Sequence, residues 1–146
     1  MPLTYTIELT DLAVVVVGYG SIGSRHARIL RQLGYSTAVV SRRETDQERH
    51  YVSLQDALDH ENPDYVVIAN RTSEHYDTFK ALSHTSYRNR VLVDKPLFGS
   101  FRPVPPHHFA QCSVGYNFRF HPVIRRCLLY TSPSPRDATL YRKPST

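Results

Sequence analysis

An apolar run that stops at three spaced glycines constrains this 146-residue chain more than any other feature. Residues 13–23 read AVVVVGYGSIG, so four valines lead into the pattern Gly18-x-Gly20-x-x-Gly23. The next stretch has the apolar spacing of an amphipathic helix, with Gly34 at its expected C-cap and apolar residues at 22, 27, 29, 30 and 33. The sequence therefore predicts a buried strand, a tight glycine turn and a helix, in that order.

This order is the context in which the glycine spacing indicates a site for the pyrophosphate of a dinucleotide. Gly18 would let the chain turn tightly off the strand, Gly20 would leave room for the phosphates, and Gly23 would let the helix pack closely. Backbone N–H groups near Ser21 and Ile22, at the positive end of the helix dipole, would face the anion. A strand-to-helix turn without a ligand is the alternative interpretation, because glycine triplets also occur in ordinary loops.

Further strand and helix patterns alternate along the chain and predict a Rossmann-type α/β fold with a doubly wound parallel sheet. Strands are expected at 37–40, 65–69, 91–93 and 113–118, and helices at 53–58, capped by Ser53, and from 72 or 73 to 82. The proline-rich stretch 99–108 is expected to be an irregular connection. Ligands of such sheets bind beyond the carboxyl ends of the strands, which selects the segments 18–23, 41–43, 70–75 and 94–96.

Composition and charge exclude several classes of protein. The 40% of hydrophobic residues suffices for one core, and the chain is too short for a two-domain enzyme. No apolar run approaches the roughly 20 residues that span a bilayer, and no signal-peptide layout is visible, so we expect a cytoplasmic protein without a membrane partner. Cys112 and Cys127 form neither a disulfide framework nor a metal-binding pair. The net charge of +5 comes from scattered residues, so we expect no nucleic-acid partner.

The residues after the second predicted strand indicate which coenzyme would bind. NAD-binding folds of this type place an acidic residue about 20 positions beyond the glycines, where it bonds the ribose 2′-hydroxyl. This chain has Ser41, Arg42 and Arg43 there, and no carboxylate before Glu44. Two guanidinium groups can pair with a 2′-phosphate, which favours NADP, with NAD as the other candidate. A solvated arginine pair that binds nothing is the alternative.

Four stretches resemble the N-terminal domain of the glucose-fructose oxidoreductase, inositol dehydrogenase and MocA-like family of oxidoreductases. They are VVVVGYGSIGSRHARIL (14–30), PDYVVIANRTSEHYDTFKAL (63–82), VLVDKPLF (91–98) and VGYNFRFHP (114–122). The resemblance implies a dinucleotide-binding Rossmann domain over 1–122 and the start of a substrate domain at 123–126. It also implies hydride transfer between a nicotinamide coenzyme and a small-molecule substrate, namely a sugar, inositol or related polyol.

The same resemblance implies that Lys95 is the catalytic residue. The family's Glu-Lys-Pro motif falls on Asp94, Lys95 and Pro96, with an acid one methylene shorter. Lys95 matches the family lysine near the nicotinamide and the substrate, where it can orient a hydroxyl or assist proton transfer. An ordinary surface lysine at a strand end is the alternative.

Four residues before this motif also match coenzyme-binding positions of the family. His75 matches a histidine near the nicotinamide half of the site, and its alternative is an exposed residue in the first turn of a helix. Asn70, Arg71 and Thr72 fall in the loop that contacts the coenzyme in relatives, where the backbone matters more than the side chains. The resemblance therefore predicts a nicotinamide side built from two loops.

The resemblance stops near Arg126. The family's second catalytic motif, an aspartate spaced from a histidine, has no counterpart in this chain. Residues 127–137 read CLLYTSPSPRD, without hydrophobic periodicity. This string resembles the translation of a transposon-end sequencing adapter. We therefore expect a non-native tail at 127–146 and a fragment that lacks the substrate domain and is inactive alone. A genuine disordered tail is the alternative.

Three classes of function stay open at this point. The first is an NADP-dependent oxidoreductase, which could associate as a homo-oligomer in its full-length form. The second is a non-catalytic dinucleotide-binding sensor or regulatory module, because a fold alone does not determine function. The third, a methyltransferase, is disfavoured because that class needs an acidic residue where Ser41, Arg42 and Arg43 stand.

Overall fold

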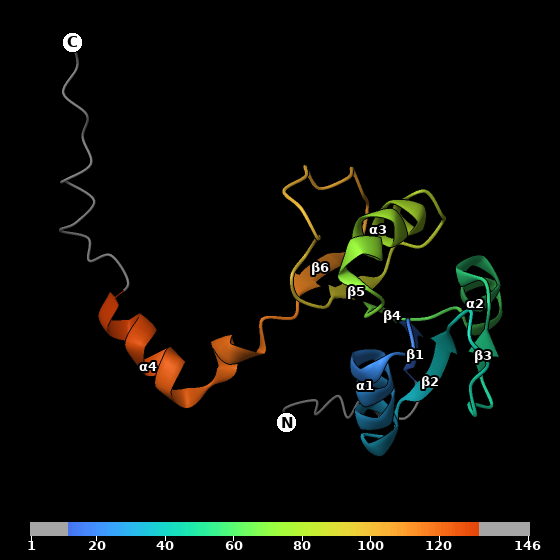
Figure 1. The fold of residues 1–146 in the computed structure, drawn as a ribbon, viewed down its shortest axis with the longest axis horizontal. Helices are drawn as coiled ribbons and strands as arrows, with labels where there is room; N and C mark the ends of the chain where they lie inside the picture. The colour runs from blue at the N-terminus through green and yellow to red at the C-terminus, as the bar shows by residue number, and fades with distance from the viewer. Residues whose placement is uncertain (1–11, 132–146) are drawn as a thin grey trace, which may run out of the picture. The chain divides into compact units, whose positions relative to one another are not determined.

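The computed structural model describes residues 12–131, and their side chains up to Cys127 (Figure 1). Spatial clustering divides the chain into two units, the first ending at Gly115 and the second beginning at Tyr116. Most of the expected tail, residues 132–146, lies outside the described part, as do residues 1–11. No helix within residues 12–131 combines the length and apolar character that crossing a bilayer requires.

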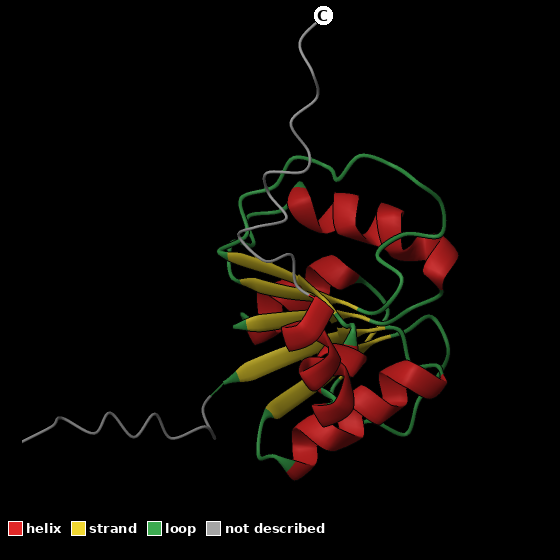
Figure 2. Ribbon diagram, turned by 90° about the vertical axis from the view of Figure 1, so that its left-hand side faces the viewer, coloured by secondary structure: helices red, strands yellow, loops and turns green. Residues whose placement is uncertain are grey.

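A six-stranded parallel sheet forms the centre of the first unit (Figures 1 and 2). Its strands are β1 (Ala13–Val17), β2 (Ser36–Val40), β3 (His50–Tyr51), β4 (Tyr65–Ile68), β5 (Arg90–Val93) and β6 (Gln111–Val114). They lie in the order β3-β2-β1-β4-β5-β6, and each neighbouring pair is parallel. The strand order reverses direction between β1 and β4, the kind of switch point at which doubly wound sheets bind ligands. The predicted fold class is confirmed.

Helices cover both faces of this sheet (Figure 2). They are α1 (Ser21–Gln32), α2 (Leu54–Glu61) and α3 (His75–Ser83), the last preceded by a short 3₁₀ helix, η2 (Thr72–Glu74). Alternate side chains of a strand point to opposite faces, so Val14 and Val16 pack with Ala27 of α1. Val15 and Val17 belong to the other cluster, which includes buried residues of α2 and α3. Burial on both sides explains why β1 is apolar throughout.

The second unit contains a 3₁₀ helix, η3 (Asn117–Phe120), and α4 (Pro122–Thr131). The predicted strand at 113–118 is wrong in its bounds, because β6 covers Gln111–Val114 and the chain then leaves the sheet for η3. The lack of hydrophobic periodicity from Cys127 onward did not predict the end of α4, which runs to Thr131. Proline suits the first turn of a helix, where its missing N–H has no intrahelical partner, and α4 continues past Cys127.

Candidate functional site

Four loops follow the carboxyl ends of β1, β2, β4 and β5 and meet at one edge of the sheet. We call them the glycine turn (18–23), the arginine turn (41–43), the β4 loop (70–75) and the lysine loop (94–96). Backbone hydrogen bonds of 2.8 Å join the starts of three loops to the ends of neighbouring strands: Gly18 N–H donates to Val40 O, Asp94 N–H to Ile68 O, and Ala69 N–H, just before the β4 loop, to Val17 O. The structure thus brings together the four segments that the sequence selected.

Gly18 is required by the fold itself. Its φ of +96° lies in the region that residues with a side chain rarely adopt. A Cβ atom added there would lie 2.5 Å from Cα of Asn70 and 2.6 Å from its nitrogen. The glycine turn and the β4 loop are therefore in direct backbone contact.

Gly23 and Gly20 have opposite surroundings. A Cβ atom on Gly23 would lie 1.9 Å from the carbonyl oxygen of Gly18, so α1 packs tightly on the turn that precedes it. A Cβ atom on Gly20 would meet no heavy atom within 4 Å. Gly20 is the N-cap of α1, with an ordinary φ of −80°. Neither the fold nor the backbone conformation requires glycine there.

The open space at Gly20 lies beside the start of α1. The first N–H groups of a helix lack intrahelical partners and carry the positive end of its dipole. Ser21 and Ile22 are exposed, the N-cap has no side-chain hydrogen bond, and the first turn has no acidic residue. These features fit a phosphate group, which would accept hydrogen bonds from this turn without repulsion from a carboxylate.

The arginine turn is closely tied to β3. Ser41 N–H donates to Tyr51 O over 2.9 Å, and Ser41 Oγ accepts from Arg43 N–H over 3.1 Å. His50 Nε2 lies 2.8 Å from Ser41 O. Arg42 and Arg43 are exposed, and neither guanidinium has an ion-pair or hydrogen-bond partner within the described side chains. Sequence analysis missed His50, because one histidine in a polar segment carries no distinguishing pattern.

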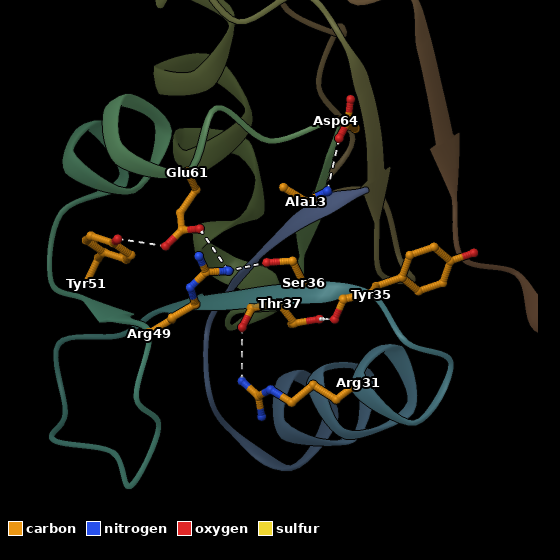
Figure 3. Close-up of polar contacts among 9 residues, drawn as sticks. All are labelled: Ala13, Arg31, Tyr35, Ser36, Thr37, Arg49, Tyr51, Glu61 and Asp64. Carbon is orange, nitrogen blue, oxygen red and sulfur yellow. Dashed lines mark hydrogen bonds and ion pairs between the residues drawn. The ribbon is translucent and has the colours of Figure 1, made fainter. Parts of the chain in front are cut away.

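A polar network around the Tyr51 side chain holds β3 in place (Figure 3). The Tyr51 hydroxyl donates to Glu61 Oε1 over 2.7 Å, and Glu61 Oε2 lies 3.5 Å from Arg49 Nη1. Arg49 also bonds to the Ser36 hydroxyl at the start of β2. The hydrogen bond to Glu61 is the main cause that raises the pKa of Tyr51 above 10.0. This two-residue strand is therefore held from α2 and from β2.

His75 joins the β4 loop to the lysine loop. Only 1% of the residue is exposed, so the alternative of an exposed histidine is wrong. Its Nδ1 lies 3.0 Å from Pro96 O and 3.3 Å from Leu97 O, and its Nε2 lies 3.1 Å from Asn70 O. The imidazole thus contacts backbone carbonyl groups on both sides.

Asn70 holds the β4 loop against α3 and leaves one polar atom without a partner. Its Nδ2 donates to Thr78 Oγ1 over 2.8 Å. Its Oδ1 is buried and is the one side-chain oxygen or nitrogen of that kind, within the described part of the chain, that has no hydrogen-bond partner. Buried acceptors are usually satisfied, so this atom suits a donor supplied from outside the chain. Arg71, which is exposed, and Thr72, half-buried, begin η2 beside it.

The lysine loop places one charged side chain in solvent. Lys95 and Pro96 are exposed and joined by a cis peptide bond, whereas Asp94 is half-buried. Asp94 Oδ1 would lie 3.5 Å from a Cβ atom added to Gly115. Within the described side chains, neither Asp94 nor Lys95 has an ion-pair partner. The Lys95 ammonium group is therefore available to a ligand at this edge of the sheet.

A cavity of about 350 Å³ lies elsewhere, near the C-terminal end of α1. It is lined by Arg31, Thr37, Asp46, Gln47, Glu48 and Arg49. None of these residues belongs to the four loops, and the Arg31 guanidinium group already donates a hydrogen bond to Thr37 O over 3.3 Å. We therefore place the candidate site at the loops and not at this cavity.

Comparison with known proteins identifies one family. The model for an oxidoreductase family with an NAD-binding Rossmann fold matches residues 12–104, which is more than half of the chain. No curated protein matches the chain. The matched region runs from the start of β1 beyond the lysine loop, and so it contains all four loops.

Proposed function

Because this chain belongs to the oxidoreductase family with an NAD-binding Rossmann fold, which the glucose-fructose oxidoreductase, inositol dehydrogenase and MocA-like proteins represent, we propose that it binds NADP for hydride transfer. The substrate would be a small molecule, a sugar, inositol or related polyol. One observation carries the proposal: the space at Gly20 is open although the flanking Gly18 and Gly23 are tightly enclosed.

The glycine turn would hold the pyrophosphate. Gly18 and Gly23 fix its shape, while Gly20 leaves the approach to the N–H groups of Ser21 and Ile22 unobstructed. Phosphate oxygens accept hydrogen bonds from such groups and are stabilised by the helix dipole.

The arginine turn would select NADP over NAD. Ser41 shapes the turn through Arg43 N–H, and the guanidinium groups of Arg42 and Arg43 have no partner among the described side chains. A guanidinium group binds phosphate oxygens with charge-assisted hydrogen bonds. NAD lacks this phosphate, so the two arginines would contribute little to its affinity.

The β4 loop and the lysine loop would form the nicotinamide side. Asn70, Arg71 and Thr72 would contact the coenzyme largely through their backbone, with His75 and Asp94 behind them and Pro96 beside Lys95. A nicotinamide coenzyme supplies the hydride acceptor or donor in this family's reactions. Lys95, exposed at the strand end, would orient the substrate hydroxyl and hold or release its proton.

The resemblance also supports proposals about the chain as a whole. We propose that residues 1–122 form the coenzyme-binding domain, that 123–126 begin the substrate domain, and that residues 127–146 contribute nothing to the site. The 146-residue chain should then bind coenzyme without turnover. The two cysteines fit a protein of the reducing cytoplasm.

Fluorescence titration of the 146-residue chain with NADPH and with NADH tests this function. We expect NADPH to bind at least about tenfold more tightly, because each charge-assisted hydrogen bond to phosphate contributes more than a neutral one. The double variant Arg42→Ala, Arg43→Ala should lose this preference and keep its NADH affinity within about twofold.

A matched control removes two exposed arginines of α4, Arg125→Ala with Arg126→Ala, which changes the net charge equally. It should leave both affinities unchanged. Equal affinity of the unaltered chain for the two coenzymes would refute NADP selection. Absence of binding to either would refute the function itself.

A further inference from the structure

We propose that His50 is a positioning residue for coenzyme selection. From β3 it holds the carbonyl group of Ser41, and so keeps the arginine turn in the shape that presents Arg42 and Arg43 to a 2′-phosphate. This inference rests on the proposed NADP site and names a residue of its selectivity that lies outside the turn itself.

Three polar groups of Ser41 are engaged at once. Its N–H donates to Tyr51 O over 2.9 Å, its Oγ accepts from Arg43 N–H over 3.1 Å, and its carbonyl oxygen lies 2.8 Å from His50 Nε2. A carbonyl oxygen can only accept, so Nε2 of His50 is the donor. These bonds fix the peptide planes on both sides of Ser41, including the one that leads into Arg42.

The His50 side chain replaces a hydrogen bond that the short strand cannot supply. The ladder between β2 and β3 pairs Val39 with His50 and Val40 with Tyr51, and then ends. Beyond it the chain turns away to Ser53, whose hydroxyl accepts from Asp56 N–H at the start of α2. The backbone already joins Ser41 N–H to Tyr51 O, and the imidazole adds a second hydrogen bond at the same residue, to the Ser41 carbonyl oxygen.

β3 is firm enough to act as a support. The Tyr51 hydroxyl is bonded to Glu61, which also pairs with Arg49 (Figure 3). The Glu61 side chain is only 7% exposed, which shields its hydrogen bond from Tyr51, whereas the side chain of its ion-pair partner Arg49 is 53% exposed. Pairing of a shielded carboxylate depends less on salt than pairing on the open surface. Arg49 and Tyr51, the residues on either side of His50 in the chain, are thus both held by Glu61.

The test measures dissociation constants of NADPH and NADH for the 146-residue chain and three variants, with melting temperatures for each. His50→Ala should weaken NADPH about five- to tenfold, the effect of losing one hydrogen bond that orders a charged site, and leave NADH within about twofold. His50→Gln keeps an N–H donor near the position of Nε2 and should restore most of the NADPH affinity.

His84→Ala is the matched control. This exposed histidine is the C-cap of α3, and among the described residues its side chain has no hydrogen bond, ion pair or ring contact with β3 or the arginine turn. The variant should leave the NADPH to NADH ratio unchanged. An equal loss for both coenzymes in His50→Ala, or an unchanged ratio, would overturn the positioning role while leaving the proposed function intact. An unaltered chain without NADPH preference would overturn NADP selection and this inference together.

Discussion

At the scale of single residues, the three glycines of the glycine turn are subject to different physical constraints. Gly18 combines a φ of +96° with backbone contact to Asn70, and Gly23 lies against the carbonyl group of Gly18. Both are therefore needed for folding. Gly20 has an ordinary backbone conformation and open space around it, so neither of these constraints applies to it.

This difference predicts opposite outcomes for two substitutions. Gly20→Ala should cost less than about 1 kcal/mol in the free energy of unfolding, because alanine at an N-cap is only slightly worse than glycine. The same variant should weaken NADPH binding by about tenfold or more, since a Cβ atom would stand where the phosphates approach. Gly18→Ala should cost about 2–4 kcal/mol through backbone strain and steric overlap.

Urea unfolding and NADPH titration of both variants check the prediction. A Gly20→Ala chain as unstable as Gly18→Ala would show that Gly20 also serves the fold. An unchanged NADPH affinity in Gly20→Ala would place the phosphates elsewhere.

At the scale of helices and strands, sequence analysis succeeded for features whose determining residues lie close together in the chain. Ser53 caps α2 as expected, with Asp56 N–H bonded to its hydroxyl. Gly34 follows Leu33, the C-cap of α1, so the predicted cap is one position off; its φ is +88°, and the N–H groups of Gly34 and Tyr35 bond to Arg31 O and Leu30 O. Both signals depend on residues within five positions of each other, which a sequence displays directly.

The elements that sequence analysis missed or bounded wrongly depend on residues that are far away in the chain. β3 has only His50 and Tyr51, too few for an alternating pattern, and it exists because β2 lies beside it. β6 ends at Val114 as the chain departs for η3. The same distinction holds in the site. The four loops could be predicted from the alternation of strands and helices along the sequence. The burial of His75, by contrast, depends on Pro96, 21 positions away.

Tyr87, which lies just before β5, predicts that the free energy of unfolding depends on pH. Tyr87 is 7% exposed and donates to Arg90 O over 2.7 Å. Burial is the main cause that raises its pKa well above 10.0, followed by the charge of Asp64. The folded chain therefore keeps this proton at pH values where the unfolded chain loses it. Stability is fully present below about pH 10 and falls above it, by about 1.4 kcal/mol per pH unit for one proton.

Tyr87→Phe should remove this contribution. At about pH 8 the variant should be less stable by about 1 kcal/mol, because Arg90 O loses its donor. Above about pH 10 its free energy of unfolding should decline less steeply than that of the unaltered chain. Urea unfolding at several pH values measures both slopes, and parallel slopes would contradict the assignment to Tyr87.

At the scale of the whole molecule, the buried core of the described residues lies entirely in the first unit. Its apolar clusters on the two faces of the sheet contain buried residues from Val14 to Phe109. All four loops of the site also precede Gly115, where the first unit ends. Folding and coenzyme binding should therefore depend little on residues after Arg126.

A chain that ends at Arg126 tests this expectation. Its melting temperature should stay within about 2 °C of that of the full chain, a shift that corresponds to less than about 1 kcal/mol. Its NADPH affinity should stay within about twofold. Loss of either property would show that residues 127–146 belong to the functional protein.

The arginine turn and the lysine loop are braced by different residues. His50 and Tyr51 hold the first, and His75 holds the second, with no hydrogen bond or ion pair between these braces among the described side chains. Mutations in one brace can accordingly accumulate without altering the geometry of the other. We therefore expect that grafting residues 41–51 alone would change the preference between the two nicotinamide coenzymes and leave the geometry of the lysine loop intact.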